Sequence, residues 1–192
     1  MSAQFDQIIY DTAIGQGFTP TAAKLVVAQA RFESADYTSN VFKLNNNTSG
    51  MKYVGQPLAT RGTPAPKNEQ RCNGGCNSDY YAKFASVGDS AKDKIVRNYG
   101  VTMGGVNPEQ LKNVKSAEEF AELLKKRSYY GFGKHGTPQG NKEQSQYAAG
   151  LNAKLIRIQI VEFVTKNKKS IAVLLLGIVA AGAAYYFYTK KK

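Results

Sequence analysis

Apolar residues recur at helical spacing over most of the first 165 positions, interrupted by one long irregular stretch. Between residues 2 and 17 they recur every three or four positions, which predicts a first helix. Thr19 before Pro20 is a typical helix start, because threonine caps free N–H groups and proline fits the first turn. The segment TPTAAKLVVAQARFESA therefore predicts a second, largely apolar helix that runs to about Ala35.

The helical pattern resumes at residues 88–99, after Asn107-Pro108, and at residues 141–163. Ser116 with Glu119 is a capping box that predicts another helix over EEFAELLKKR. Residues 40–79 differ, being rich in Asn, Gly and Pro, and are too long for a simple connection. The predicted fold class is therefore α+β, with a mostly helical domain over residues 1–160 and a small β-rich lobe.

The C-terminal residues have a different pattern, since residues 171–188 (IAVLLLGIVAAGAAYYFY) contain no charge. With one residue on each side the segment reaches about 30 Å as a helix, which matches the hydrocarbon core of a bilayer. We expect a transmembrane helix at 170–189, preceded by a basic linker at 161–169 and followed by a basic tail at 190–192. This predicts a single-pass, C-terminally anchored membrane protein with the lipid bilayer as a partner.

The net charge of +12 has to be located before it is interpreted. Of the 26 Lys and Arg residues, 20 precede position 166, as do all 14 acidic residues, so this part carries only +6. The other six positive residues flank the apolar segment. Because no basic stripe with interleaved aromatic residues is visible, we do not expect a nucleic-acid partner.

The two cysteines, Cys72 and Cys76, stand in the Gly/Asn-rich segment RCNGGCNSD. A small disulfide-closed loop and two free thiols are both compatible with that context. A four-cysteine zinc site is excluded, and with the single His135 the chain offers only three such ligands. We therefore expect neither a metal nor a cofactor.

Glu33 is the carboxylate whose position is most informative. It ends the apolar second helix immediately before the long loop region, where a helical lobe would meet an irregular one. A carboxyl group in such a cleft has its protonated form favoured by desolvation, as a general acid requires. Without further evidence, a surface residue at a helix end is the better explanation of Glu33.

The residues around Glu33 resemble the glucosaminidase family of peptidoglycan hydrolases, which includes flagellar-rod-type muralytic enzymes and bacterial autolysins. The resemblance lies in QARFES at residues 29–34 and NNTSGMKY at residues 46–53. Downstream, YAKFAS at 81–86, LKKRSYY at 124–130 and QYAAGL at 146–151 follow in the family's order. The chain departs from the family at Ala35, where many relatives have glycine, and at Thr48-Ser49, where a hydrophobic pair is common.

The resemblance implies a lysozyme-like fold and cleavage of the β-1,4 bond after N-acetylglucosamine in the peptidoglycan glycan strand. Glu33 matches the general acid, and Tyr129 or Tyr130 matches a tyrosine of the cleft. Residues 46–53 would form the floor of the cleft. The resemblance therefore implies that substrate is bound by Asn46, Asn47, Lys52, Tyr53 and Tyr130.

The second catalytic group is open at this stage. Inverting and retaining glycosidases both need a second carboxylate, unless the substrate's own N-acetyl group assists. Asp79 and Glu69 lie in the loop region and are the candidates, while Asp36 is close in sequence but is expected to point elsewhere.

Two other functions fit the same residues. A lytic transglycosylase would share the fold and the single glutamate, and a non-catalytic membrane-anchored protein could bind the cell wall. Because the first 18 residues show no secretion signal, the predicted setting is a phage virion with an internal membrane, or phage lysis. Other virion membrane proteins would then be partners; a bacterial membrane-tethered autolysin is the alternative.

Overall fold

The computed structural model describes the backbone of residues 2–166 and the side chains of residues 2–159. The first compact unit of the chain is Met1–Leu155, and a second begins at Ile156. The helices are α1 (Ser2–Gly15), α2 (Pro20–Glu33), α3 (Asn40–Asn45), α4 (Val87–Lys94), α5 (Pro108–Lys112), α6 (Ala117–Lys126) and α7 (Pro138–Lys166). The strands are β1 (Ala59–Pro64) and β2 (Tyr80–Phe84), with short helical turns η1 (Lys67–Glu69), η2 (Asn77–Asp79) and η3 (Ile95–Tyr99).

Helix α2 lies in the core, as expected for a helix whose apolar residues cover most of its surface. Thr19 caps it, because its Oγ1 accepts the Ala22 N–H at 3.3 Å, and Pro20 occupies the first turn. Helix α1 packs against both α2 and α4. The buried residues of α2 run without a break from Leu25 to Arg31, so its last turn, which carries Glu33, is held from several directions.

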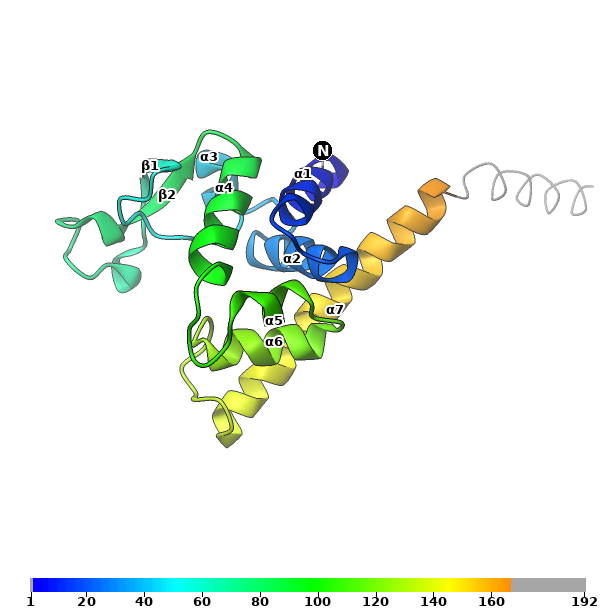
Figure 1. Ribbon diagram of the computed structural model, residues 1–192. Helices are drawn as coiled ribbons and strands as arrows, with labels where there is room; N and C mark the ends of the chain where they lie inside the picture. Colours follow the sequence, from blue (N-terminus) through cyan, green and yellow to red (C-terminus); the bar gives the residue numbers. More distant parts are fainter. Residues whose placement is uncertain (1, 167–192) are drawn as a thin grey trace, which may run out of the picture. The chain divides into compact units, whose positions relative to one another are not determined.

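The β-rich lobe is smaller than residues 40–79 suggested. Strands β1 and β2 pair antiparallel with Ala59 opposite Phe84, and a bulge shifts the register before Pro64 meets Tyr80. The short helix α3 contacts both strands. In Figure 1 the two strands and their connecting loop lie together, apart from α5 and α6.

Residues 95–99 form a π-helix turn at the end of α4, where a regular helix over 88–99 was predicted. The Gly100 N–H bonds to the Ile95 carbonyl at 2.8 Å, which is five residues back. Arg127 stabilises the segment that follows, because its guanidinium donates to the carbonyls of Val101 (2.8 Å), Val106 (3.0 Å) and Asn98. Such turns are frequent at functional sites, and this one leads directly into the site described below.

The predicted fold class is corrected in one respect. None of the helices within residues 2–166 combines the length and the apolar character needed to cross a membrane. The predicted membrane helix at 170–189, with its linker and tail at 161–169 and 190–192, lies outside the residues whose side chains are described. The described chain is thus α+β, mostly helical with a two-stranded sheet and without a membrane helix.

Candidate active site

Glu33 is the last residue of α2, and the backbone turns sharply after it. Residues 35–37 all have positive φ angles of 52°, 54° and 66°, which L-residues adopt only at a cost. Ser34 holds the start of this turn, since its Oγ donates to the Ala30 carbonyl (2.6 Å) and accepts the Tyr37 N–H (3.0 Å). Backbone strain of this kind is concentrated at functional sites.

Arg31 ties the same turn to the first helix. Its guanidinium donates to both carboxylate oxygens of Asp6, at 2.8 and 2.5 Å, and to Asp36 at 3.3 Å. The Arg31 side chain is buried, so this bidentate pair is shielded from water. Asp36 also binds Lys154 of α7 at 2.7 Å, so its carboxylate is part of the structural network around the turn.

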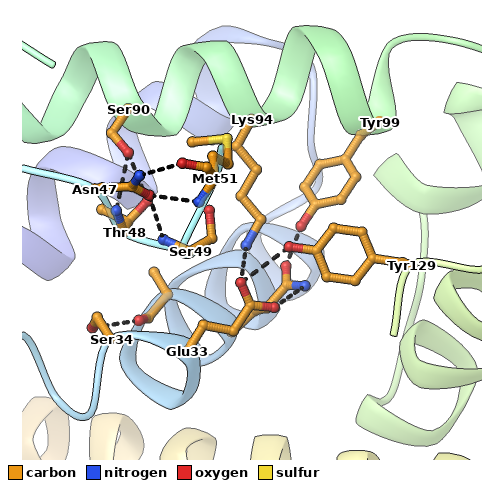
Figure 2. A network of polar contacts seen from close by, with 12 residues as sticks. Glu33, Ser34, Asn47, Thr48, Ser49, Met51, Ser90, Lys94, Tyr99 and Tyr129 are labelled. Atoms are coloured by element: carbon orange, nitrogen blue, oxygen red, sulfur yellow. Dashed lines mark hydrogen bonds and ion pairs between the residues drawn. The ribbon is translucent and has the colours of Figure 1, made fainter. Parts of the chain in front are cut away.

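Four side chains donate hydrogen bonds to the Glu33 carboxylate, and Figure 2 shows those from Lys94 and Tyr129. Gln29 Nε2 and the Tyr147 hydroxyl reach Oε1 at 2.9 and 2.6 Å. Lys94 Nζ and the Tyr129 hydroxyl reach Oε2 at 3.1 and 3.0 Å. The donors come from α2, α4, the loop after α6, and α7, so the carboxylate is fixed where four parts of the chain meet.

Burial sets the charge state of these donors. It raises the pKa of the Tyr129 and Tyr147 hydroxyls well above their ordinary value, and the negative charge of Glu33 raises it further. Both tyrosines are therefore neutral donors. Burial lowers the pKa of Lys94, whose side chain is 2% exposed, although the Glu33 carboxylate opposes that shift. Glu33 itself keeps 15% of its side chain exposed, so substrate can reach it.

A second layer of contacts holds the donors in place. Gln29 is fully buried and donates to the Tyr147 hydroxyl at 2.7 Å, while its Oε1 accepts a hydrogen bond from the Tyr99 hydroxyl. The Tyr130 ring stacks on Tyr147 with centroids 4.0 Å apart, and its hydroxyl donates to the Ala121 carbonyl. Of the two tyrosines that the resemblance left open, Tyr129 is thus the one whose hydroxyl contacts Glu33.

A cleft of about 310 Å³ opens beside Tyr129. One wall comes from the end of α4 and the π-helix turn, and another from the loop that follows α3. The residues that line it are Ser49, Met51, Lys52, Val54, Gln56, Asp93, Arg97, Asn98 and Tyr129. Tyr129, whose hydroxyl bonds to Glu33, connects the cleft to the carboxylate, and part of the predicted floor segment 46–53 does line the cleft.

Asn46 and Asn47 support the floor through bonds within the chain. Asn46 ends α3 in a left-handed conformation (φ 51°), and its amide donates to the Phe84 carbonyl at 3.0 Å. The Asn47 amide donates to the Met51 and Ala82 carbonyls, and its Oδ1 accepts the Met51 N–H at 3.0 Å. The predicted contacts of these two amides with sugar compete with bonds that they already make.

Lys52 and Tyr53 lie at the start of the β-rich lobe. Lys52 lines the cleft, and its ammonium group pairs with Glu69 at 2.6 Å. The hydrogen bond from Lys52 lowers the pKa of Glu69, which also accepts from the Tyr81 hydroxyl at 2.9 Å. Tyr53 is half-buried, and its N–H donates to the Tyr80 carbonyl at 2.8 Å. Glu69 is thus engaged as the partner of Lys52.

The Asp79 carboxylate is engaged in hydrogen bonds with the backbone of its own loop. The residue is fully buried, and its carboxylate oxygens accept the N–H groups of Arg71 (2.6 Å), Cys72 (3.0 Å) and Gly74 (2.7 Å). Burial raises the pKa of Asp79, but the backbone donors outweigh this effect and lower it overall. Both predicted second carboxylates are therefore committed to contacts within the β-rich lobe.

Cys72 and Cys76 form a disulfide, which decides between the two alternatives that the sequence left open. The sulfur atoms and an Asp79 oxygen lie within 4.8 Å of one another, the spacing of a metal-ligand set. The sulfurs are bonded to each other, however, and the Asp79 oxygens already accept backbone hydrogen bonds. These residues close the loop and do not make a suitable metal site.

Sequence reasoning missed three of the four donors to Glu33, as well as one carboxylate in the cleft. Gln29 could have been found, because it precedes Glu33 by four residues and so lies on the same face of α2. Lys94 and Tyr147 are 61 and 114 residues away from Glu33 and have no local signal. Asp93 resembled an ordinary charged residue on a helix surface, but its side chain is buried and lines the cleft.

Comparisons with known proteins support the fold. No protein-family description matches the sequence, and no curated protein does. A chain in a type VI secretion system effector–immunity complex from Pseudomonas protegens superposes with a TM-score of 0.51 and 17% identity, over 81% of this chain and 91% of that one. The catalytic domain of the autolysin Auto from Listeria monocytogenes superposes with a TM-score of 0.51 and 18% identity, over 84% of each chain.

At such low identity the similarity establishes the fold and nothing finer. The chain shares its fold with the catalytic domain of an autolysin. The glucosaminidase resemblance, the predicted roles of the site residues and the cellular location stay predictions.

Proposed function

We propose that this protein is a peptidoglycan hydrolase that cleaves the β-1,4 bond after N-acetylglucosamine, with Glu33 as its general acid. The observation that carries the proposal is the Glu33 carboxylate, held by four donors next to a cleft of about 310 Å³. The fold shared with an autolysin catalytic domain supports the same substrate class.

A general acid must carry a proton when the substrate is bound, and the proposal requires this of Glu33. Lys94 Nζ lies 3.1 Å from Glu33 Oε2, and burial lowers the pKa of that lysine. Glu33 gives its proton to the glycosidic oxygen as the bond from that oxygen to the anomeric carbon breaks.

The two tyrosines can follow the carboxyl group through this change. A phenol hydroxyl both donates and accepts, so Tyr129 and Tyr147 can turn their hydrogens as Glu33 is protonated and deprotonated. Their bonds of 3.0 and 2.6 Å fix the direction of the carboxyl group in either state. Orientation of this kind is worth several powers of ten in rate when the reacting atoms are aligned.

The proposal is tested by clearing of purified peptidoglycan sacculi. The wild-type protein should lower the turbidity of the suspension, and Glu33→Gln should reduce the rate at least about a hundredfold, the usual contribution of a general acid. Glu122→Gln, which changes an exposed carboxylate paired with Lys126 on α6, is the matched control and should keep the wild-type rate. Clearing by Glu33→Gln at the wild-type rate would refute the assignment.

A lytic transglycosylase is the second candidate, because Glu69 and Asp79, the second carboxylates predicted from sequence, are engaged elsewhere. Such an enzyme needs one catalytic glutamate and releases an anhydro-sugar where a hydrolase adds water. The two reactions leave different sugar ends, so the products distinguish them.

A further inference from the structure

Two residues that line the cleft each carry a buried oxygen atom without a hydrogen-bond partner. Among the side chains that the structure describes, the buried polar atoms in this condition are Ser49 Oγ and Asp93 Oδ2. Both residues line the cleft beside Tyr129. Leaving a buried polar group unpaired costs about 1–3 kcal/mol, so two on the residues of one cleft point to partners from outside the chain, either water or a ligand.

Contacts between their two segments fix the positions of Ser49 and Asp93 relative to each other. Thr48, which precedes Ser49, donates its N–H to Ser90 Oγ at 3.0 Å, and the two hydroxyl groups lie 3.0 Å apart. Ser90 is one helical turn before Asp93 on α4. Figure 2 shows Thr48, Ser49 and Ser90 close together beside Lys94. The loop that carries Ser49 is thus attached to the helix that carries Asp93.

The cleft is also linked to Glu33 through Lys94 and Tyr129. Lys94, the residue after Asp93, contacts Glu33 Oε2 at 3.1 Å, and Tyr129 contacts the same oxygen at 3.0 Å. A ligand that bonds to Asp93 and Ser49 therefore lies next to the carboxyl group proposed to protonate the glycosidic oxygen.

The chemistry of the two atoms selects the ligand. Burial raises the pKa of Asp93, with the positive charge of Arg97 opposing the shift, and a carboxyl oxygen can accept a hydrogen bond whether the group is ionised or protonated. The Ser49 hydroxyl can donate. A secondary amide presents one N–H and one carbonyl on opposite edges, which matches an acceptor facing a donor. Met51 and Val54, which line the same cleft, offer apolar surface for a methyl group.

We propose that Ser49 and Asp93 bind the acetamido group of an N-acetylated sugar, with Asp93 Oδ2 accepting its N–H and Ser49 Oγ donating to its carbonyl. The proposal rests on the proposed function, because it assigns the part of the glycan strand that lies beside Glu33. It makes the two residues determinants of specificity for the substituent at C2 of the sugar.

The test compares two neutral β-1,4 tetrasaccharides that differ in the C2 substituent. Chitotetraose carries N-acetyl groups, and cellotetraose carries hydroxyls. Binding is measured calorimetrically with the full chain bearing Glu33→Gln, so that no sugar is cleaved. Chitotetraose should bind at least about tenfold more tightly than cellotetraose, since one hydrogen bond of ordinary strength corresponds to about a tenfold change in affinity.

In that background Ser49→Ala and Asp93→Ala should each weaken chitotetraose binding about tenfold and leave cellotetraose binding unchanged. Asp89→Ala, which changes a half-buried carboxylate in the first turn of the same helix, is the matched control and should change neither affinity. Ser49→Ala removes a polar atom that has no partner, so the melting temperature of this variant should not fall. A residue with a purely structural role would show the reverse, a lower melting temperature with unchanged binding.

Equal binding of the two sugars, or unchanged chitotetraose binding in Ser49→Ala and Asp93→Ala, would overturn the inference. Its failure can be told apart from failure of the proposed function. If Ser49→Ala and Asp93→Ala, made with Glu33 intact, clear sacculi at the wild-type rate, only the acetamido site is contradicted. If chitotetraose binds through Ser49 and Asp93 but the wild-type protein never clears sacculi, only the proposed hydrolase activity is contradicted.

Discussion

Glu33 combines partial exposure with contacts from four side chains, and this combination defines the site at the scale of single residues. A carboxylate at a helix end that served only solubility would not be surrounded by a half-buried tyrosine, a buried tyrosine, a buried lysine and a buried glutamine. Each of these donors loses its own hydration on folding. The chain therefore gives up solvation at several residues in order to fix one carboxyl group.

Tyr147 makes the shortest of the four bonds, at 2.6 Å, and Tyr147→Phe removes it while keeping the ring that stacks on Tyr130. We expect a loss of about 1 kcal/mol in the free energy of unfolding, the usual net value of one hydrogen bond. Activity on sacculi should fall about tenfold, because Glu33 loses part of its orientation. Urea unfolding and initial clearing rates measure the two effects, and full activity in this variant would contradict the role given to Tyr147.

Tyr10→Phe on α1 is the matched control for this substitution, since it removes a phenol hydroxyl outside the Glu33 network. It should leave the clearing rate at the wild-type value.

At this scale the sequence was informative where chemistry is local. Glu33 and Tyr129 were both predicted, and the structure joins them at 3.0 Å although 96 residues separate them. Lys94 and Tyr147 were not predicted, because their bonds to Glu33 depend on how α4 and α7 pack. Asp79 and Glu69 were reasonable candidates by residue type, yet only the fold reveals that their oxygens already have partners.

At the scale of elements, the turn after α3 joins the helical part of the unit to the sheet. Asn47 is 1% exposed, and its side chain bonds to the backbone of Ser49, Met51 and Ala82. It fixes the loop that forms one wall of the cleft. The Asn-rich composition of the segment predicted a turn, but not that one amide would hold both the turn and β2.

Asn47→Ala should destabilise the protein by about 2–3 kcal/mol, because several buried backbone groups lose their partner at once. Asn68→Ala, an exposed amide in the same lobe, should change the stability by less than about 0.5 kcal/mol. Denaturant unfolding measures both values. Equal stability of the two variants would show that Asn47 does not hold the turn.

Glu143 of α7 pins the loop that carries Tyr129. It pairs with the buried Lys125 of α6 and accepts N–H groups of Phe132 (3.3 Å) and Gly133 (3.1 Å). The bond from Lys125 leads the causes that lower the pKa of Glu143 from 4.5 to about 2. Because the folded pKa is the lower one, this contribution to stability is full above about pH 4.5 and is lost as the pH falls towards 2.

Glu143→Gln should therefore lower the melting temperature at neutral pH and reduce its further fall on acidification to about pH 3. Glu109→Gln, which changes an exposed carboxylate on α5, should keep the wild-type dependence on pH. An unchanged pH profile in Glu143→Gln would contradict the assigned ion pair.

Local sequence signals predicted most of the helices but not the pairing of the two strands. The capping residues Thr19, Asn107 and Ser116 predicted three helix starts that the structure contains. Helix α3 was hidden within the region predicted as loop, although Ser39 caps it. The bulged register of β1 and β2 depends on contacts between distant segments, and no period in the sequence specified it.

At the scale of the molecule, the fold is shared with an autolysin catalytic domain at 18% identity, which establishes the fold alone. The first 165 residues carry a net charge of +6, which favours approach to the anionic polymers of a cell envelope. This charge is compatible with the substrate class proposed above.

The most direct measurement is mass spectrometry of purified peptidoglycan after digestion. The wild-type protein should release fragments with new reducing-end N-acetylglucosamine, Glu33→Gln should release none, and Glu122→Gln should match the wild type. Anhydromuramic acid ends would identify a transglycosylase instead. The absence of any new sugar end after digestion with folded wild-type protein would contradict the central claim that Glu33 cleaves the glycan strand.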